Sequence, residues 1–171
     1  ASLPGRVAGI DLLEALLTRA QSEGFGVYLL GARPEVVEAA ARRIGERWPD
    51  LRVCGTADGY FSTEGAAERA RAVARSEAQI LVVGMGVPRQ ELWIQSRITP
   101  QHCTVPVAVG ALFDIFTGSV PRAPDWMLKL RIEWVYRLWR EPRRLWRRYL
   151  IGNPKFVLAI AKAYFSGTSN G

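Results

Sequence analysis

The sequence predicts an α/β fold: a Rossmann-like parallel sheet with flanking helices, followed by a C-terminal helical appendage. Short, nearly continuous apolar runs alternate with segments of helical periodicity, which is typical of parallel strands covered by helices on both faces. The character of the chain then changes after Pro124, where Trp and basic residues become frequent. With 171 residues, 49% of them hydrophobic, the chain can bury a core, which excludes a disordered or fibrous protein.

The first strand and its two neighbouring helices follow from local patterns. Apolar residues recur at helical spacing over 7–20, where Asp11 lies in the first turn, so a helix is expected there. The β-rich run 26–30 ends at Gly31 and predicts a strand. A proline then opens the next helix, which we expect at 34–47.

Turn-forming residues separate the remaining strands and helices, as at 57–60 and 84–88. The apolar runs between them indicate strands, and the longer periodic segments indicate helices. In chain order, we expect a strand at 51–54, a helix at 64–76, a strand at 79–83, a short helix ending at Trp93 and a strand at 105–109 that ends at Gly110.

The appendage is expected to consist of two or three helices. Their approximate ranges are 125–140, 142–150 and 154–165, with interruptions at Pro142 and at 152–154. We therefore divide the chain into an α/β domain, 1–124, and a helical appendage, 125–171.

All of the net positive charge lies in the last part of the chain. Residues 1–121 hold 12 Lys and Arg against 13 Asp and Glu, whereas residues 122–171 hold 11 against 3. Four of the six Trp residues lie there as well. This composition suits phosphates, nucleic acid or an anionic membrane surface, and no recognised nucleic-acid motif accompanies it.

Several site classes are excluded by composition. Cys54 and Cys103 are too few and too far apart for a metal cluster or a disulfide framework, and they favour a reducing cytoplasm. His102 has no clustered partner, so we interpret it as an incidental surface residue. No stretch approaches the roughly 20 apolar residues that span a bilayer. Because the sequence opens with neither Met nor a signal-peptide core, we expect it to be cut from a longer protein.

Glycine follows the expected strands at the edge of the sheet where ligands of parallel α/β proteins bind. Gly31, Gly84, Gly86 and Gly110 predict a cleft there, although simple turn chemistry would also explain them. After Pro88, the amide of Gln90 could hydrogen-bond a sugar or uracil. The alternative is that Gln90 and Glu91 are an exposed polar pair favoured by the helix dipole.

Arginines recur at helical spacing in the appendage, where 143 and 147, and likewise 144 and 148, are four residues apart. Guanidinium groups bind phosphate oxygens in pairs, which suits a diphosphate. The alternative is a solvated face attracted to a lipid surface, and both roles can apply to different arginines.

Six segments, distributed over nearly the whole chain, resemble the WecG/TagA/CpsF glycosyltransferase family in order and spacing. They are RVAGIDL at 6–12, GMGVPRQE at 84–91, VGALFD at 109–114, RAP at 122–124, EWVYR at 133–137 and the Glu-Pro, Arg and Tyr pattern of 141–149.

The resemblance implies a bacterial enzyme that is cytoplasmic and peripherally bound to the inner face of the cell membrane. It would transfer an N-acetylmannosamine-type sugar from a UDP-sugar to an undecaprenyl-diphosphate-linked sugar, with inversion and without metal or other cofactor. The products would enter teichoic acid or another surface polysaccharide. The sugar, the acceptor and the oligomeric state stay open.

The resemblance also assigns residues. Arg6 corresponds to an active-site arginine and Gln90 to a pocket glutamine, while Arg137, Arg144 and Arg147 match arginines that close over the site. The expected substrate-binding residues are Gly31, Gly84, Gly86, Pro88, Gln90, Glu91 and Gly110.

The general base of the family lies in an Asp-Gly segment that precedes the Arg6 motif, so we expect it upstream of residue 1. Asp114 and Glu91 are the strand-end carboxylates considered as substitutes, and neither is assigned as the base. A different interpretation is therefore that residues 1–171 alone form a non-catalytic, UDP-binding and membrane-docking module.

Overall fold

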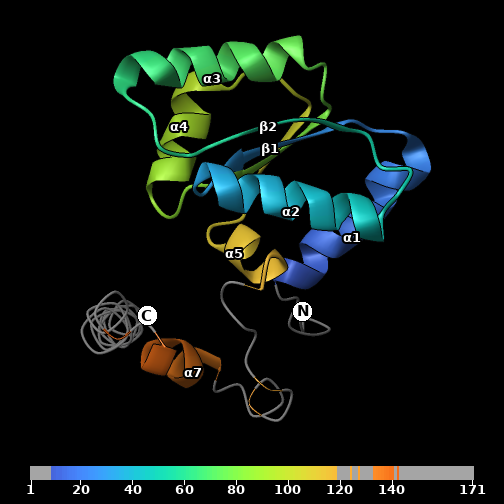
Figure 1. Ribbon diagram of the computed structural model, residues 1–171. Helices are drawn as coiled ribbons and strands as arrows, with labels where there is room; N and C mark the ends of the chain where they lie inside the picture. The colour runs from blue at the N-terminus through green and yellow to red at the C-terminus, as the bar shows by residue number, and fades with distance from the viewer. Residues whose placement is uncertain (1–8, 119–123, 125–126, 128–132, 141, 143–171) are drawn as a thin grey trace, which may run out of the picture. The chain divides into compact units, whose positions relative to one another are not determined.

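The computed structural model describes residues 9–118, 124, 127, 133–140 and 142 (Figure 1). The backbone divides into two compact units, Ala1–Pro121 and Arg122–Gly171, which are considered separately below. The helices and strands are, in chain order, α1 (Gly9–Glu23), β1 (Val27–Gly31), α2 (Pro34–Arg47), β2 (Val53–Ala57), α3 (Thr63–Arg75), β3 (Ile80–Gly84), α4 (Arg89–Arg97), β4 (Val105–Ala108), α5 (Leu112–Phe116) and α7 (Glu133–Arg140).

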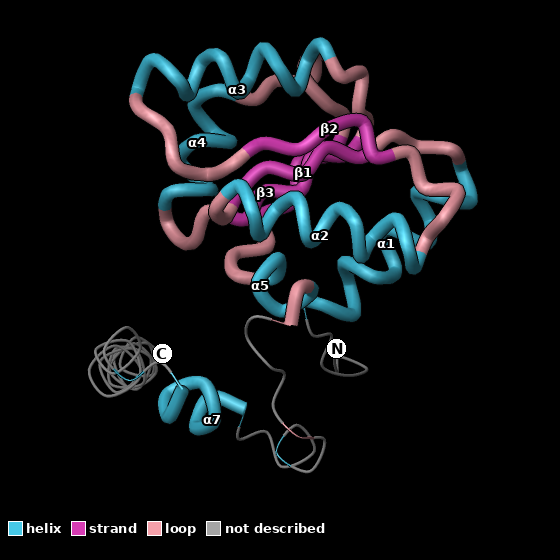
Figure 2. The backbone as a smooth tube through the Cα atoms, in the orientation of Figure 1, coloured by secondary structure: helices cyan, strands magenta, loops and turns pink. Residues whose placement is uncertain are grey.

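The first unit is a parallel sheet with the strand order β2-β1-β3-β4. Helices α1, α2 and α5 lie on one face of the sheet, and α3 and α4 lie on the other (Figures 1 and 2). The predicted α/β class is therefore confirmed. Since all four strands run in the same direction, their carboxyl ends meet at a single edge, where the predicted glycines lie.

Alternate side chains of β1 and β3 pack into two separate hydrophobic cores, one on each face of the sheet. Val27 and Leu29 point toward α1, α2 and α5, whereas Leu30 and Val83 point toward α3 and α4. Every residue of β1 and β3 is buried, as expected for strands covered on both faces. Burial of these side chains contributes about 1.5–3 kcal/mol each to the stability of the unit.

The outer strand β4 departs from that expectation. Its apolar sequence predicts a buried strand, yet Val105 is 43% exposed and Pro106 is exposed as well. β4 pairs only with β3 within the described sheet. Pro106, which lacks a backbone N–H, fits a strand with a single neighbour because no hydrogen bond to a second strand is lost.

Three elements, β2, α4 and α5, differ most from the sequence-based prediction. β2 begins at Val53 and continues to Ala57, because Leu51 turns into the core before the strand begins. α4 continues past Trp93 to Arg97. The short helix α5 was missed, since its five residues are too few to show helical periodicity.

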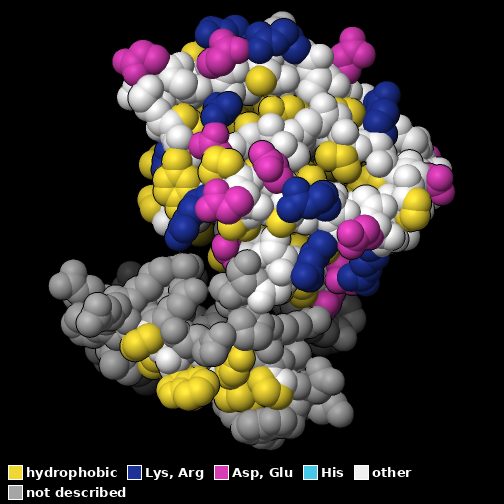
Figure 3. All heavy atoms as spheres, viewed as in Figure 1, with side chains coloured by type: hydrophobic (Ala, Val, Ile, Leu, Met, Phe, Trp, Pro, Cys, Tyr) yellow, Lys and Arg dark blue, Asp and Glu magenta, His cyan; other side chains and the backbone are white. Residues whose placement is uncertain are grey.

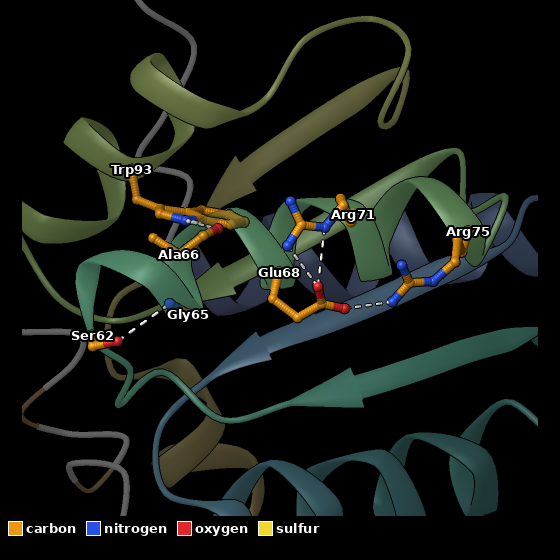
Figure 4. A network of polar contacts seen from close by, with 7 residues as sticks. All are labelled: Ser62, Gly65, Ala66, Glu68, Arg71, Arg75 and Trp93. Atoms are coloured by element: carbon orange, nitrogen blue, oxygen red, sulfur yellow. Dashed lines mark hydrogen bonds and ion pairs between the residues drawn. The ribbon is translucent and has the colours of Figure 1, made fainter.

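Helices α3 and α4 are joined by a buried hydrogen bond. Figure 4 shows the indole of Trp93, on α4, pointing to the carbonyl oxygen of Ala66, on α3, and its N–H donates to that oxygen at 3.2 Å. The same view shows Ser62, whose hydroxyl accepts from the N–H of Gly65 and caps α3. Glu68 pairs with Arg71 and Arg75 on the exposed side of α3. The contact of Trp93 with Ala66 fixes the start of α3 relative to α4.

A glutamine side chain links two neighbouring strands at the opposite, amino-terminal edge of the sheet. The Oε1 atom of Gln79 accepts hydrogen bonds from the backbone N–H of Gly26 at 2.7 Å and from the Arg52 guanidinium at 3.2 Å. Gly26 precedes β1 and Gln79 precedes β3, so this side chain joins the starts of neighbouring strands.

In the second unit, α7 falls within the helix that the sequence predicts at 125–140. Trp139 on α7 is 76% exposed. The helices expected at 142–150 and 154–165 lie outside the described residues, apart from Pro142. Among the helices that the structure describes, none has the length and apolarity that crossing a membrane requires.

The close approach of β1 to β3 leads to a stability prediction. A Cβ atom at Gly31 would collide with the carbonyl of Gly84, and Gly31 has a φ of 148°, which disfavours a side chain. Gly31→Ala should therefore destabilise the fold by at least about 2 kcal/mol in urea unfolding. The control is Gly45→Ala in α2, where a Cβ would meet nothing within 4 Å, and a gain of about 0.5–1 kcal/mol is expected. Equal stability of the two variants would contradict this account.

Candidate functional site

The glycines at the carboxyl edge of the sheet divide into a closed group and an open group. Gly31, Gly59 and Gly84 are closed, because a Cβ at each would press against backbone or side-chain atoms. Backbone hydrogen bonds of 2.9 Å join these loops, from the N–H of Ala32 to the oxygen of Gly84 and from the N–H of Gly59 to the oxygen of Ala32. The closed glycines therefore let the ends of β1, β2 and β3 pack together.

Gly86 and Gly110 form the open group. Both have positive φ values, 82° and 61°, and a Cβ at either would meet nothing within 4 Å. Gly86 follows β3 and Gly110 follows β4, the neighbouring strand. Since no atom of the described residues lies within 4 Å of these Cβ positions, the described part of the chain leaves room for a ligand beside both glycines.

The side chain of Gln90 joins the two open turns. Its Oε1 atom accepts hydrogen bonds from the backbone N–H of Gly86 at 3.2 Å and of Gly110 at 3.0 Å. Its Nε2 atom donates to Oε1 of Glu91 at 2.8 Å. Gln90 is only 2% exposed and is the one buried polar residue within the described part of the chain. Its oxygen thus holds the two turns, and its Nε2 group holds the carboxylate of Glu91.

The loop after β2 contributes an acid that sequence reasoning missed. Oδ1 of Asp58 accepts from the backbone N–H of Tyr60 at 2.9 Å, and Oδ2 forms an ion pair with Arg69. The strand was expected to end at residue 54, which placed Asp58 in a turn. The strand in fact ends at Ala57, directly before Asp58. Had the longer strand been predicted, Asp58 would have been recognised as a residue at the strand end.

Phe61 is the centre of an aromatic and cationic cluster in the same loop. Its ring centroid lies 6.0 Å from that of Trp93, 5.2 Å from the guanidinium carbon of Arg89 and 6.0 Å from that of Arg69. Nη2 of Arg89 also donates to the backbone oxygen of Phe61 at 3.3 Å. These contacts connect the loop after β3 with the loop after β2.

Two groups with shifted pKa values are unsuited to catalysis. Burial raises the pKa of Tyr28, an effect that Arg69 and Arg75 partly offset, and its hydroxyl donates to the oxygen of Thr56 at 3.4 Å. Burial also raises the pKa of the Cys103 thiol, so this group stays protonated and unreactive at neutral pH. Across the described residues, no group of three or more His, Cys, Asp or Glu is arranged to hold a metal ion.

The expected site residues fall into three sets. Pro88 and Glu91 are exposed and flank the buried Gln90 at the edge of the sheet, as their sequence position predicts. Arg137 lies on α7, although its side chain is outside the described part. Arg6, Arg144 and Arg147 lie outside the described residues altogether.

A protein family and a known relative match most of the chain in sequence. The family model described as Glycosyl transferase WecG/TagA/CpsF family matches residues 1–170. A Bacillus subtilis (strain 168) relative, N-acetylglucosaminyldiphosphoundecaprenol N-acetyl-beta-D-mannosaminyltransferase, is 33% identical over 160 residues. The match covers 94% of this chain and 61% of the relative, so the chain spans about three fifths of that protein's length. The family resemblance inferred from the sequence is confirmed.

The Gln90 contacts predict a local structural effect of mutation. Gln90→Ala leaves the N–H groups of Gly86 and Gly110 without their acceptor, which should cost about 1–3 kcal/mol and speed hydrogen exchange at both amides. The control is Gln95→Ala on the exposed face of α4, which should change neither quantity. Unaltered exchange at Gly86 and Gly110 in Gln90→Ala would show that this amide does not hold the turns.

Proposed function

The chain belongs to the WecG/TagA/CpsF glycosyltransferase family, and on this premise we propose that the protein transfers a sugar from a UDP-sugar to an undecaprenyl-diphosphate-linked sugar. The donor sugar is of the N-acetylmannosamine type, and the product enters a cell-surface polysaccharide or teichoic acid. The activity for which the Bacillus subtilis relative is named supports this choice of donor and acceptor. Because the chain spans 61% of that relative, the activity is proposed for the whole protein.

The open turns at Gly86 and Gly110 are the observation that carries the proposal. They lie at the edge of a parallel sheet where ligands bind, and no atom of the described residues fills the space beside either glycine. Gln90 keeps them at a fixed separation through two hydrogen bonds. A nucleotide sugar placed there would meet a preformed surface, which lowers the cost of ordering the site on binding.

The reaction requires positive groups near the departing diphosphate. A hydroxyl of the acceptor sugar attacks the anomeric carbon, the bond to the diphosphate breaks, and UDP leaves with increased negative charge. Electrostatic stabilisation of such charge is usually the largest catalytic contribution. We assign this task to Arg137, Arg144 and Arg147, with Arg6 also in the site. The reaction then proceeds with inversion and without a metal ion.

The general base is proposed to come from outside residues 1–171. Two of the strand-end carboxylates already have partners, since Asp58 pairs with Arg69 and Glu91 accepts from Gln90. A base must take the proton of the attacking hydroxyl, so its carboxylate has to face the acceptor sugar rather than a partner in its own chain. This supports a separate acid for the task.

A second candidate function is a non-catalytic module that binds UDP and docks on a membrane. The basic, Trp-rich segment 125–171 favours it, because cationic side chains and indole rings suit an anionic lipid surface. Docking and transfer are compatible if residues 125–171 place the protein on the inner face of the membrane. Turnover therefore decides between the two.

Transfer of labelled sugar tests the proposal directly. The protein should move radiolabelled N-acetylmannosamine from UDP to a short-chain lipid-diphosphate acceptor. Arg137→Ala, Arg144→Ala and Arg147→Ala should each lower turnover by at least about tenfold, since each removes a donor to developing charge. Arg19→Ala, at an exposed ion pair on α1, is the control and should have no effect. UDP binding without any transfer would favour the docking module.

Liposome sedimentation tests the membrane role separately. Removal of 125–171 should release the protein from anionic vesicles and should matter less for neutral ones, because the segment carries most of the excess positive charge. Added salt should weaken the binding of the intact protein. Sedimentation of the shortened protein to the same extent as the intact one would place the membrane contact elsewhere.

A further inference from the structure

We propose that Arg89 binds the diphosphate of the nucleotide-sugar donor, an inference that rests on the proposed function. Three arginines follow or lie near strand ends at the carboxyl edge, and two of them have acidic partners. Arg33 lies 3.9 Å from Glu35, and Arg69 pairs with Asp58. Arg89 forms no ion pair with any carboxylate in the described part of the chain. Its charge is therefore available to a ligand.

The guanidinium of Arg89 is held in place before any ligand binds. It lies over the ring of Phe61, 5.2 Å from the centroid, and Nη2 donates to the backbone oxygen of the same residue at 3.3 Å. These contacts use one face and one N–H, so the remaining donors of the fork stay free for phosphate oxygens.

Phe61 is itself fixed, which makes the position of Arg89 specific. Its ring contacts Trp93, and Trp93 is tied to Ala66 by the buried hydrogen bond between α4 and α3. The next residue, Ser62, caps α3. Ordering a free arginine side chain on a ligand normally costs up to about 2 kcal/mol, and much of that cost is already met here.

Arg89 also lies close in sequence to the open backbone. It begins α4 three residues after Gly86, beside which the described residues leave open space. Glu91 in the same helical turn is the competing negative charge, but its carboxylate is held by the Gln90 amide. A donor whose nucleoside lies over Gly86 and Gly110 would bring its diphosphate toward the N-terminus of α4, which favours an anion.

Calorimetry with UDP and uridine tests the role of Arg89, because only UDP carries the diphosphate. Arg89→Met keeps an apolar stem on Phe61 and removes the charge. Its affinity for UDP should fall between about tenfold and a hundredfold, while its affinity for uridine stays unchanged. Arg97→Met, at the other end of α4, removes the same charge and should alter neither affinity.

Three results would overturn the inference. UDP affinity could be unchanged in Arg89→Met, UDP and uridine affinities could fall equally, or the variant could raise KM only for the lipid-diphosphate acceptor. Arg89→Lys covers the case in which Arg89→Met fails to fold, because it keeps the charge but loses the fork of the guanidinium. A UDP affinity at least tenfold below native supports the inference, as does one between those of the native and Met proteins where Arg89→Met folds. An unchanged UDP affinity of Arg89→Lys rejects the inference. If the native protein binds neither UDP nor uridine, the proposed function fails instead.

Discussion

The hydrogen bonds of Gln90 determine how the turns are arranged at the carboxyl edge of the sheet, where a ligand is proposed to bind. Gly86 and Gly110 adopt left-handed turns after neighbouring strands, and their inward N–H groups need an acceptor that the sheet does not supply. One amide oxygen serves both. Because Gln90 lies in the first turn of α4, the separation of the turns depends on where that helix packs. Trp93 fixes α4 against α3, so contacts on one face of the sheet determine the geometry of its edge.

Positive charge is distributed unevenly between the two units. On the face shown in Figure 3, Lys and Arg side chains lie interspersed with Asp and Glu over the α/β unit. That unit is close to neutral, whereas 122–171 holds 11 basic residues against 3 acidic ones. In the proposed reaction, the general field of the α/β unit would therefore contribute little to stabilising a leaving diphosphate. The proposed reaction needs individually placed cations, which is why the guanidinium of Arg89, which has no acidic partner among the described residues, matters more to the proposal than the total charge.

The sequence was most informative where a residue type has a single structural meaning. Pro34 marked the start of α2, and Gly31, Gly84 and Gly110 marked the strand ends, because few other residues satisfy those backbone demands. Long-range packing was not predictable. The burial of Leu51 moved β2 along the chain and so concealed Asp58, and no local pattern shows that Gln90 reaches the turn after β4, 20 residues away. The contacts between Phe61 and Arg89 join loops that are 28 residues apart and were missed for the same reason.

A glutamine carboxamide links neighbouring strands at the amino-terminal edge of the sheet, and another links the turns at its carboxyl edge. Gln79 joins the starts of β1 and β3, and Gln90 joins the turns after β3 and β4. A carboxamide does not titrate in the range in which Asp, Glu and His change charge. The hydrogen bonds that the oxygens of Gln79 and Gln90 accept from backbone N–H groups therefore involve no group that titrates in this range. If the rate of the proposed transfer varies with pH, the variation is expected to reflect the reacting groups and the phosphates rather than a loss of the hydrogen bonds made by Gln79 and Gln90.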